Sequence, residues 1–523
     1  MKLFVLFNPN WFEWPLAIGE EMARRHGGCR LRGIVTGERR VYETVVGRNG
    51  SGVSDVDWLE HLERRWLDTA LDERRIRRRE AEYDAQTLRR IIIADRQIGH
   101  GFVSGGKTPR TALVRRTQDF DQVRRYVVGL LEHLTNEFEK HRPDLVLTHV
   151  IASGPAYALG CVAERFGIPF AQLGDTRIGS HVVIQDRREP TLSAVQDVFG
   201  KTSADPAIVA EKYEIAKSYL EEFRASQLAP VYAERAAASA KQSLSVNFLL
   251  RQTAADIVGS MRDLARRKPT ELRKLSRPQL GVHRASKWFS ARNALRNGIF
   301  DDVADIPDEK FAYFPLHVDP EASTMVLSPD NTDQIATIRA IAKHLPLDFN
   351  LVVKEHFPML GLRPAGFYAA IKRIPGVYLV SPFEDNMRLL KSCALTCTIT
   401  GTVGWEALLL GKPLVLIGEP HYAALEEGLV RCPDLRLLSE AIQRAIKTPP
   451  ADDKRLILFI ASLLKDSIEF PGALIWDRQT PELVRQNWDV VRQLCDRLDR
   501  IATTPLTGDA ADANSTSTAS LGA

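Results

Sequence analysis

The sequence predicts an α/β protein with two parallel β-sheets, because apolar strands alternate with helices in two separate stretches of the chain. In the first stretch, a strand at 144–150, a helix at 156–166 and a strand at 168–173 follow one another, and Gly167 ends the helix. In the second stretch, the expected strands are 311–315, 350–354, 377–379, 395–399 and 414–417, with helices such as 330–343 and 402–410 between them. Open parallel sheets bind ligands beyond the carboxyl ends of their strands, so the chemistry is expected in the loops that follow these strands.

Five segments are expected along the chain. The first α/β domain spans 1–185, with further strands at 2–7 and 91–93 and a helix at 119–140. Segment 186–305 is rich in Ala, Glu, Lys and Arg and is predicted to be a helical insertion or connector. The second α/β domain spans 306–445, C-terminal helices span 446–502, and a Thr-, Ser- and Ala-rich tail at 503–523 is expected to be disordered.

Composition indicates an ordinary soluble protein of 523 residues with a net charge of only +4. The six cysteines have no zinc-type spacing, and the N-terminus lacks a basic region and a cleavage site, which fits a cytoplasmic protein. We expect no nucleic-acid partner. We interpret the basic runs 74–79 and 266–274 as solvated faces of helices. The alternative is that they make peripheral contact with the inner membrane, a polyanionic glycan or an assembly complex.

The clearest site motif lies where the strand at 395–399 meets the next helix. Thr400, Gly401 and Thr402 turn the chain there, and a helix N-terminus beside two hydroxyls suits a phosphate. Glu406, on the first turns of that helix, is placed to accept the hydroxyls of a ribose. The alternative interpretation is an ordinary helix cap with a charged first turn.

Two other strands also end in polar residues. The strand at 350–354 delivers Lys354 and His356, and a cation with an imidazole suits a phosphate or a leaving nucleotide. After the strand at 311–315 come His317, Asp319 and Glu321, which either face a ligand or form a turn with helix-capping acids.

These three segments, in this order, resemble the capsular polysaccharide biosynthesis family through "YFPLHVDPEAST", "VVKEH" and "ITGTVGWEALLLGKP". The family resembles GT-B glycosyltransferases, which have two Rossmann-type domains facing across a cleft, and includes enzymes that transfer Kdo (3-deoxy-octulosonic acid) from CMP-Kdo. A weaker resemblance continues through "ADR" at 94–96 and "LGDTRIGSHVVIQD" ending at Asp186.

The resemblance implies roles for individual residues. His356 would contact the nucleotide, Thr400, Gly401 and Thr402 would cradle the donor phosphate, and Glu406 would match the ribose-binding carboxylate of related epimerase-like folds. One departure stands out: the His-Pro pair usual in the family is His356-Phe357 here, with proline one place later. The loop after this strand is therefore expected to differ in shape.

An inverting sugar transfer needs a base that takes the proton of the acceptor hydroxyl. Asp175, just past the strand at 168–173, is the first candidate, and Asp95, after the expected strand at 91–93, is the second. Either one is alternatively a turn former or a helix cap. Since no DxD-type motif occurs in a suitable loop, we expect no metal site and no obligatory cofactor.

The segment from Gly101 to Thr108 matches the P-loop pattern GxxxxGK[ST]. A true P-loop directly follows a strand and opens a helix, whereas here the six residues from Asp95 to His100 separate it from the expected strand, taken to Ala94, and Pro109 follows at once. We interpret it as a flexible loop on the acceptor side, near Asp95 and Arg96.

The function expected from the sequence is transfer of a sugar, such as Kdo from CMP-Kdo, from a nucleotide-activated donor to a capsular or other surface glycan or glycolipid. Two alternatives stay open: a sugar-nucleotide epimerase of similar fold, and a non-catalytic subunit of glycan assembly.

Overall fold

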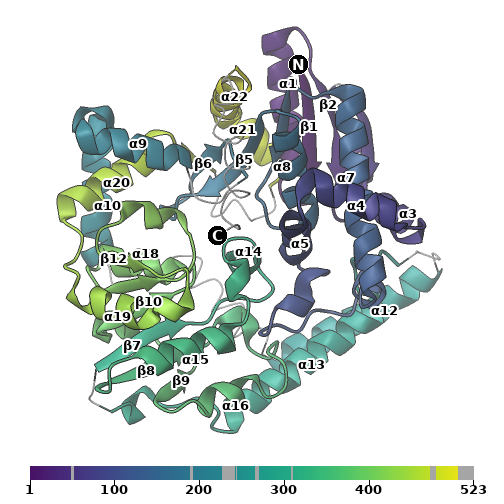
Figure 1. Cartoon of the computed structure of the whole chain (residues 1–523). Coiled ribbons are helices and arrows are strands. Elements are labelled where there is room, and N and C mark those ends of the chain that lie inside the picture. Colours follow the sequence, from purple (N-terminus) through teal and green to yellow (C-terminus); the bar gives the residue numbers. More distant parts are fainter. Residues whose placement is uncertain are drawn as a thin grey trace, which may run out of the picture.

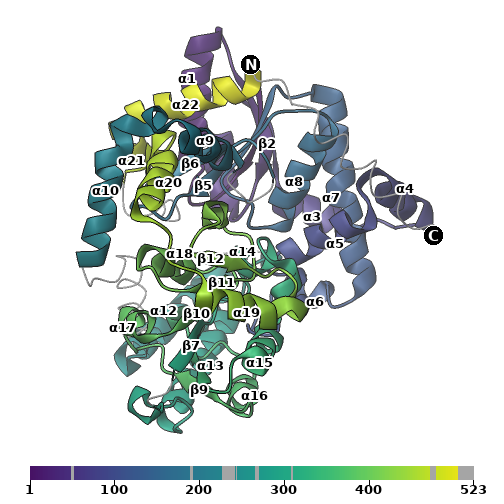
Figure 2. The same ribbon diagram turned by 60° about the vertical axis from the view of Figure 1, so that its left-hand side comes forward.

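The computed structural model describes residues 1–48, 52–188, 193–225, 242, 244–265, 270–307, 310–471 and 479–503. Figure 1 shows a seven-stranded sheet with its helices in one half of the molecule and a six-stranded sheet in the other. The same division is visible after rotation in Figure 2. Two sheets built mainly from parallel strands confirm the predicted GT-B-like fold class.

The seven-stranded sheet has the order β13-β6-β5-β4-β1-β2-β3. Its strands are β1 (Lys2–Phe7), β2 (Arg30–Val35), β3 (Val53–Trp58), β4 (Leu145–Thr148), β5 (Phe170–Asp175), β6 (His181–Gln185) and β13 (Ile468–Glu469). The first five strands are parallel, while β6 runs antiparallel to β5 and β13 antiparallel to β6. Leu3 and Val5 pack on one face of the sheet, whereas Phe4 and Leu6 pack on the other, so helices must cover both faces.

The helices of this half are α1 (Glu13–His26), α2 (Arg39–Val46), α3 (Leu59–Asp68), α4 (Glu73–Tyr83), α5 (Ala85–Ala94), α6 (Ala112–Arg116), α7 (Phe120–His141) and α8 (Gly154–Arg165). The long helix α7 begins at the N-cap Asp119, whose side chain accepts a hydrogen bond from the backbone N–H of Asp121. The predicted strand–helix–strand unit is confirmed as β4, α8 and β5.

The predicted strand at 91–93 is wrong, because these isoleucines lie in helix α5. Asp84 caps that helix by accepting a hydrogen bond from the N–H of Thr87. Leu88, Ile91 and Ile92 are buried at the i, i+3, i+4 spacing of one helical face, and this face packs into the core beside α7 and α8. Three consecutive isoleucines alone fit the pattern of a strand. Together with Leu88, one turn earlier, they fit the apolar face of a helix.

The six-stranded sheet is entirely parallel, in the order β12-β11-β10-β7-β8-β9. Its strands are β7 (Lys310–Pro315), β8 (Phe349–Lys354), β9 (Val377–Val380), β10 (Leu395–Thr398), β11 (Leu414–Leu416) and β12 (Leu429–Arg431). The helices of this half are α14 (Ala322–Met325), α15 (Gln334–His344), α16 (Phe367–Lys372), α17 (Asn386–Ser392), α18 (Thr402–Leu409) and α19 (Leu438–Lys447). All five strands predicted here are confirmed, and β12 is an addition at the edge.

Seven further helices complete the described part of the chain. They are α9 (Ser193–Ala204), α10 (Ala210–Ala225), α12 (Val246–Ala265), α13 (Arg277–Arg296), α20 (Asp453–Lys465), α21 (Pro481–Gln486) and α22 (Trp488–Thr503). Helix α22 returns to the first half, where Arg25 of α1 forms ion pairs with Asp496 and Asp499. The predicted disordered tail lies, from residue 504 on, outside the described residues.

A cluster of buried charges in the first half surrounds Arg273, which lies between α12 and α13 in the chain. The Arg273 guanidinium donates to Asp95 at 2.9 and 3.3 Å and to Glu63 at 2.7 Å, and neither carboxylate is exposed. Burial alone would raise the pKa of Asp95, but Arg273 and the N–H groups of Gln97 and Ile98 lower it. This arrangement fixes the turn after α5.

Removing this guanidinium is expected to destabilise the fold. Arg273→Met leaves two buried carboxylates without their cation, which costs about 3–5 kcal/mol in the free energy of unfolding. Urea denaturation of this variant measures the loss. Arg96→Met, at an exposed position in the same turn, is the matched control, and equal stability of the two variants would contradict the structural role of Arg273.

Candidate functional site

The candidate site lies where three neighbouring strands of the second sheet end. In the order β10-β7-β8, the carboxyl ends of these strands lead to Thr400, His317 and Lys354, respectively. The prediction that the strands at 350–354 and 395–399 share one parallel sheet is confirmed, because β7 pairs with both. Parallel pairing brings the three polar segments to one edge.

The turn into α18 is held largely by its own hydrogen bonds. The Thr400 hydroxyl donates to the carbonyl of Ser323 at 2.8 Å, and the N–H of Gly401 donates to the Thr398 hydroxyl at 3.1 Å. Thr400 is fully buried, so its hydroxyl shapes the turn rather than facing a ligand. The groups that remain for an anion are the first N–H groups of α18, which lack partners within the helix, and the Thr402 hydroxyl.

Arg177 crosses from the first half of the molecule to this helix N-terminus. Its guanidinium donates to the Thr402 hydroxyl at 2.9 Å. Its backbone has φ of 64°, a left-handed conformation that is uncommon for a residue with a side chain, and its N–H donates to Asp175 at 2.9 Å. The turn after β5 thus places Asp175 and Arg177 opposite the end of β10.

Lys354 is a buried cation at the end of β8. Its side chain is 8% exposed, and among the described residues no carboxylate lies within ion-pair distance of its Nζ. Burial lowers its pKa to about 8, against the opposing influence of Glu355 and other acids. The ammonium instead lies 5.2 Å from the centre of the Phe357 ring, so the residue that departs from the family pattern covers the lysine by a cation–π contact.

Glu406 faces the same region from helix α18. Within the described part of the chain, its carboxylate accepts one hydrogen bond, from the side-chain amide of Asn386 at 3.1 Å, and Asn386 in turn accepts a bond from the Tyr313 hydroxyl at 2.6 Å. Burial raises the pKa of Glu406 to about 7, while Arg177 and Lys354 both act to lower it. Two cations from opposite halves of the molecule therefore lie near one buried carboxyl group.

Two buried histidines lie near Thr400 and Arg177, respectively, and both are neutral. His317 Nε2 accepts the N–H of Thr400 at 3.3 Å, and burial lowers the pKa of His317 to about 3. Burial and the nearby Arg177 lower the pKa of His421 to about 3 as well. Among the described residues, His317 Nδ1 and His421 Nε2 have no hydrogen-bond partner. Buried ring nitrogens without partners are unusual and leave these positions open to a ligand.

The residues that shape the ends of β7 and β8 are tied together by Arg363. Its buried guanidinium donates twice to Glu355 at 2.9 Å, contacts Asp319 at 3.4 Å, and donates to the carbonyl of His317 at 2.9 Å. Asp319 also accepts a bond from Thr324 at 2.8 Å. These acids are committed to the framework and are not available to a ligand.

The segment that matches the P-loop pattern is not a phosphate loop. It comes after helix α5, its first two residues belong to a 3-10 turn at Gly99–Phe102, and it docks on the second half of the molecule. The N–H of Lys107 donates to the carbonyl of Leu362 at 2.8 Å, and a Cβ on Gly106 would lie 2.1 Å from the carbonyl oxygen of Asp319. The loop therefore makes a close backbone contact with the second half of the molecule.

The other predicted site residues are placed as follows. His356 is exposed, and its N–H donates to the Glu355 carboxylate at 2.6 Å. Glu321 precedes α14 and accepts a bond from the Ser323 hydroxyl at 3.2 Å, as expected of a turn acid. Asp95 is fully buried against Arg273, so its carboxylate cannot reach an acceptor hydroxyl, and Asp175 is the better candidate base.

Three residues of this group were missed in the sequence. Arg177 lies inside the "GDTR" segment, where its proximity to the aspartate was the available signal. Asn386 lies in helix α17 and His421 in the 3-10 turn His421–Leu425, and neither belongs to a motif at a strand end. Asn386 meets Glu406 within the second half, whereas the packing of the two halves brings His421 near Arg177.

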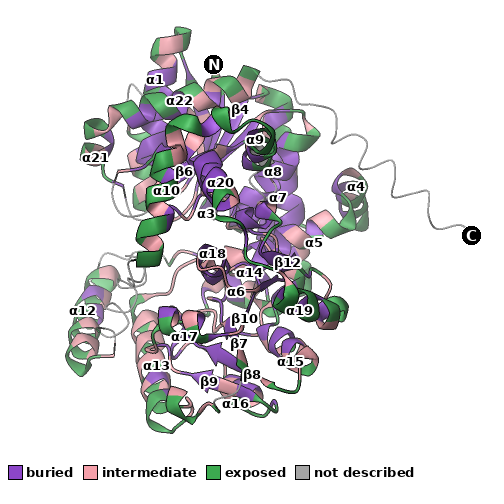
Figure 3. Ribbon diagram, turned by 90° about the vertical axis from the view of Figure 1, so that its left-hand side faces the viewer, coloured by how far each residue is buried: buried purple, intermediate pink, exposed green. Residues whose placement is uncertain are grey.

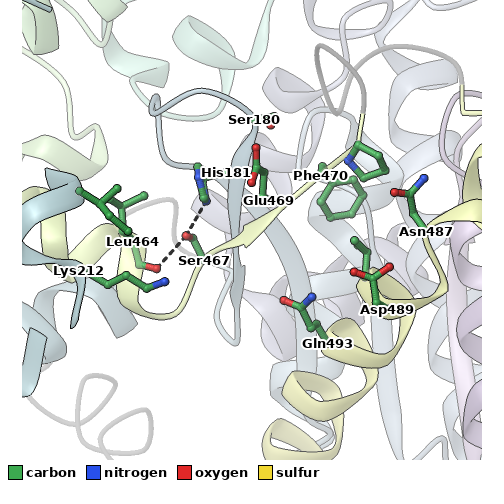
Figure 4. Close-up of a pocket in the computed structure, with 13 residues that line it drawn as sticks. Ser180, His181, Lys212, Leu464, Ser467, Glu469, Phe470, Asn487, Asp489 and Gln493 are labelled. Carbon is green, nitrogen blue, oxygen red and sulfur yellow. Dashed lines mark hydrogen bonds between the residues drawn. The ribbon is translucent and has the colours of Figure 1, made fainter. Parts of the chain in front are cut away.

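A separate pocket lies along β6, β13 and α22. Figure 4 shows His181 accepting or donating a hydrogen bond with Ser467 at 3.0 Å, with Lys212, Glu469 and Asp489 around the hollow. None of the predicted site residues lines this pocket. Its mixed charges form no anion site comparable to the α18 N-terminus.

The fold and this edge of polar residues define an α/β protein of the GT-B-like class. Residues 310–439 match the family model described as capsule polysaccharide biosynthesis protein, which confirms the resemblance that the three motifs predicted. No curated protein sequence matches the chain.

Solved structures show distant likenesses. One is the UDP-GlcNAc 2-epimerase from Neisseria meningitidis bound to UDP-GlcNAc, with 11% identity, coverage of 89% of this chain and 98% of that chain, and a TM-score of 0.27. Another is KpsC from Thermosulfurimonas dismutans, described as a β-Kdo 2,7 transferase, with 14% identity, coverage of 70% and 89%, and a TM-score of 0.29. At these TM-scores neither likeness carries an argument about function.

The two buried histidines should make the protein sensitive to mild acid. Because each is neutral when folded but has a pKa near 6.5 when unfolded, the unfolded state binds more protons below pH 6.5 and the free energy of unfolding falls. His317→Gln keeps an acceptor for the N–H of Thr400 and should reduce the loss of stability between pH 7 and pH 5 by about 2 kcal/mol.

Urea denaturation at both pH values measures this difference. His344→Gln, at the end of α15, makes the same change outside the site. If His317→Gln loses as much stability as the wild type over this range, His317 is not held neutral by burial.

Proposed function

We propose that the protein is a glycosyltransferase that uses a nucleotide-activated sugar to extend a capsular or other surface glycan. The observation that carries the proposal is the pair of cations, Arg177 and Lys354, brought from different halves of the molecule to the N-terminus of α18 and to Glu406. A buried lysine without a carboxylate partner is costly for the folded chain. An anionic ligand offsets that cost, and a nucleotide phosphate has the required charge.

Each group has a distinct part in the proposed transfer. The N-terminus of α18, the Thr402 hydroxyl and Arg177 hold the donor phosphate, and Lys354 stabilises the negative charge that develops on the leaving nucleotide. Glu406 accepts hydroxyls of the ribose. Asp175 takes the proton of the acceptor hydroxyl, since it is half-buried at the end of β5 and lies beside Arg177.

We also propose a donor, a stereochemical outcome and a metal-independent reaction. The donor is CMP-Kdo, and the family match at 310–439 supports a role in capsule synthesis. The transfer inverts the anomeric centre and needs no metal, because the two cations supply the charge that a metal would supply. Acceptor-dependent release of CMP from CMP-Kdo tests the proposal, and other sugar nucleotides tested in parallel identify the donor.

A second candidate is a sugar-nucleotide epimerase, which needs acids on both sides of the sugar. One observation favours it: Glu406 and Asp175, from opposite halves, both raise the pKa of Tyr219, although burial is the larger cause. Conversion of the sugar nucleotide without an acceptor would identify the epimerase. Release of nucleotide only with an acceptor would identify the transferase.

The first prediction from this proposal concerns Lys354 and pH. Since burial lowers its pKa to about 8, the ammonium is charged below that pH, and donor binding should weaken as the pH rises through 8. Lys354→Gln should weaken donor binding about ten- to a hundredfold at pH 7, by the loss of about 1.5–3 kcal/mol. Isothermal titration calorimetry with CMP or CMP-Kdo measures both effects.

Lys354→Arg serves as the charged counterpart, because arginine keeps its proton throughout this range. It should bind the donor with little change between pH 7 and pH 9. Lys107→Gln is the control for loss of a lysine from the segment that matches the P-loop pattern. Unchanged affinity in Lys354→Gln, or complete loss in Lys107→Gln, would show that the phosphate lies elsewhere.

The second prediction separates Asp175 from Asp95. Asp175→Asn cannot accept a proton, so transfer should fall by about 10²- to 10⁴-fold while donor binding is retained. Asp95→Asn instead removes the partner of Arg273 and should lower the melting temperature. Steady-state rates, calorimetry and thermal melting on the pair distinguish the two roles. An Asp175→Asn variant with wild-type turnover would exclude it as the base.

A further inference from the structure

Helix α12 carries a stripe of exposed apolar side chains. Val246, Leu250, Ile257, Met261 and Leu264 are 47%, 62%, 57%, 59% and 81% exposed, respectively. At 3.6 residues per turn, these five positions fall within about 60° of one another around the helix. A soluble protein rarely leaves such a contiguous apolar stripe in contact with water, so the stripe marks an interaction surface.

The opposite face of α12 explains how the helix is held. Asp256 and Gly259 are its buried residues, and Asp256 forms an ion pair with Arg284 of α13 at 2.5 Å. Asp263 pairs with Arg277 of α13 at 2.8 Å. Figure 3 shows the hairpin of α12 and α13 at the side of the molecule, with α12 largely exposed and intermediate. The apolar stripe therefore points away from α13.

Positive charge is concentrated on this same hairpin. Helices α12 and α13 together contain seven Arg and Lys but only two Asp and no Glu, whereas the whole chain has a net charge of only +4. Helix α13 contains five Arg and Lys and no acidic residue. Arg251 and Arg262 lie on α12, on one side of the apolar stripe, by the same helical geometry. The two helices thus carry a net charge of +5, more than the whole chain.

We propose that the α12–α13 hairpin docks the protein on an anionic lipid bilayer. The apolar stripe of α12 enters the boundary between headgroups and acyl chains, and Arg251 and Arg262 bind lipid phosphates. In the described part of the chain, no helix is long and apolar enough to cross a bilayer, so the contact lies in the plane of the interface. A second copy of the chain is a poorer occupant, because two hairpins of high positive charge repel each other.

The hairpin is firmly attached to the candidate site. Ala291 and Ala294 of α13 pack against Leu360, in the loop that follows His356. Lys287 donates to the carbonyl of Pro358 at 3.4 Å, and a Cβ on Gly361 would lie 2.2 Å from the carbonyl oxygen of Lys287. Docking through α12 would therefore hold the end of β8 in a fixed orientation to the bilayer. An acceptor carried on a lipid would then meet the site from one direction.

The test is flotation of the full-length protein with vesicles. The wild type should float with vesicles of phosphatidylcholine and phosphatidylglycerol at 60:40 and not with phosphatidylcholine alone. Leu250→Gln/Ile257→Gln/Leu264→Gln should reduce binding to the anionic vesicles at least about tenfold, because the stripe no longer gains from leaving water. Arg251→Gln/Arg262→Gln should reduce it by about fivefold for each arginine removed.

The matched control is Ile215→Gln/Leu347→Gln/Leu437→Gln, which changes three equally apolar residues that are exposed elsewhere. This variant should bind vesicles like the wild type, and circular dichroism should show native helix content in all variants. The proposal is overturned if the wild type does not float with anionic vesicles, or if the α12 triple variant binds them unchanged. It is also overturned if sedimentation shows a wild-type dimer that the α12 triple variant dissociates, since the stripe would then be covered by a second copy.

Discussion

The buried guanidinium of Arg363 is the interaction on which the candidate site depends. It lies between Glu355 and Asp319 and also donates to the carbonyls of His317 and Gly105. One side chain thereby joins the ends of β7 and β8 to a loop from the other half of the molecule. Because all its partners are buried, any displacement would leave an unpaired charge in the interior, which costs several kcal/mol.

This framework allows the ligand-facing charges to remain incompletely satisfied. In the residues that the structure describes, Lys354 contacts the Phe357 ring and has no carboxylate within ion-pair distance, and Glu406 has a single amide donor. Arg177 is held in a left-handed backbone conformation close to both. Strain and unpaired charge of this kind persist only where the surrounding packing enforces them, and they are typical of binding sites.

On the α12–α13 hairpin too, the residues that hold the structure together are separate from those that would bind a ligand. Asp256 and Asp263 neutralise two arginines of α13 and so hold the hairpin together, while the other face of α12 is left apolar and basic. The residues that stabilise the hairpin and the residues proposed to contact lipid are therefore different. Substitutions can therefore change the proposed lipid contact without destabilising the hairpin.

The sequence by itself determined the parallel strands of the second sheet and the turn at Thr400, Gly401 and Thr402, because hydrophobic period, β-branched residues and glycine are local properties. It misassigned 91–93, since three isoleucines fit a strand or a buried helix equally well until Leu88 and the packing on α8 decide between them. Only the tertiary structure could show that Arg177 meets Thr402, that Asp95 is bound to Arg273, and that the loop at Gly106 docks on Asp319. Each of these pairs joins residues more than a hundred positions apart or hides a charge in the core, and the energy of a buried charge depends on neighbours that no local pattern records.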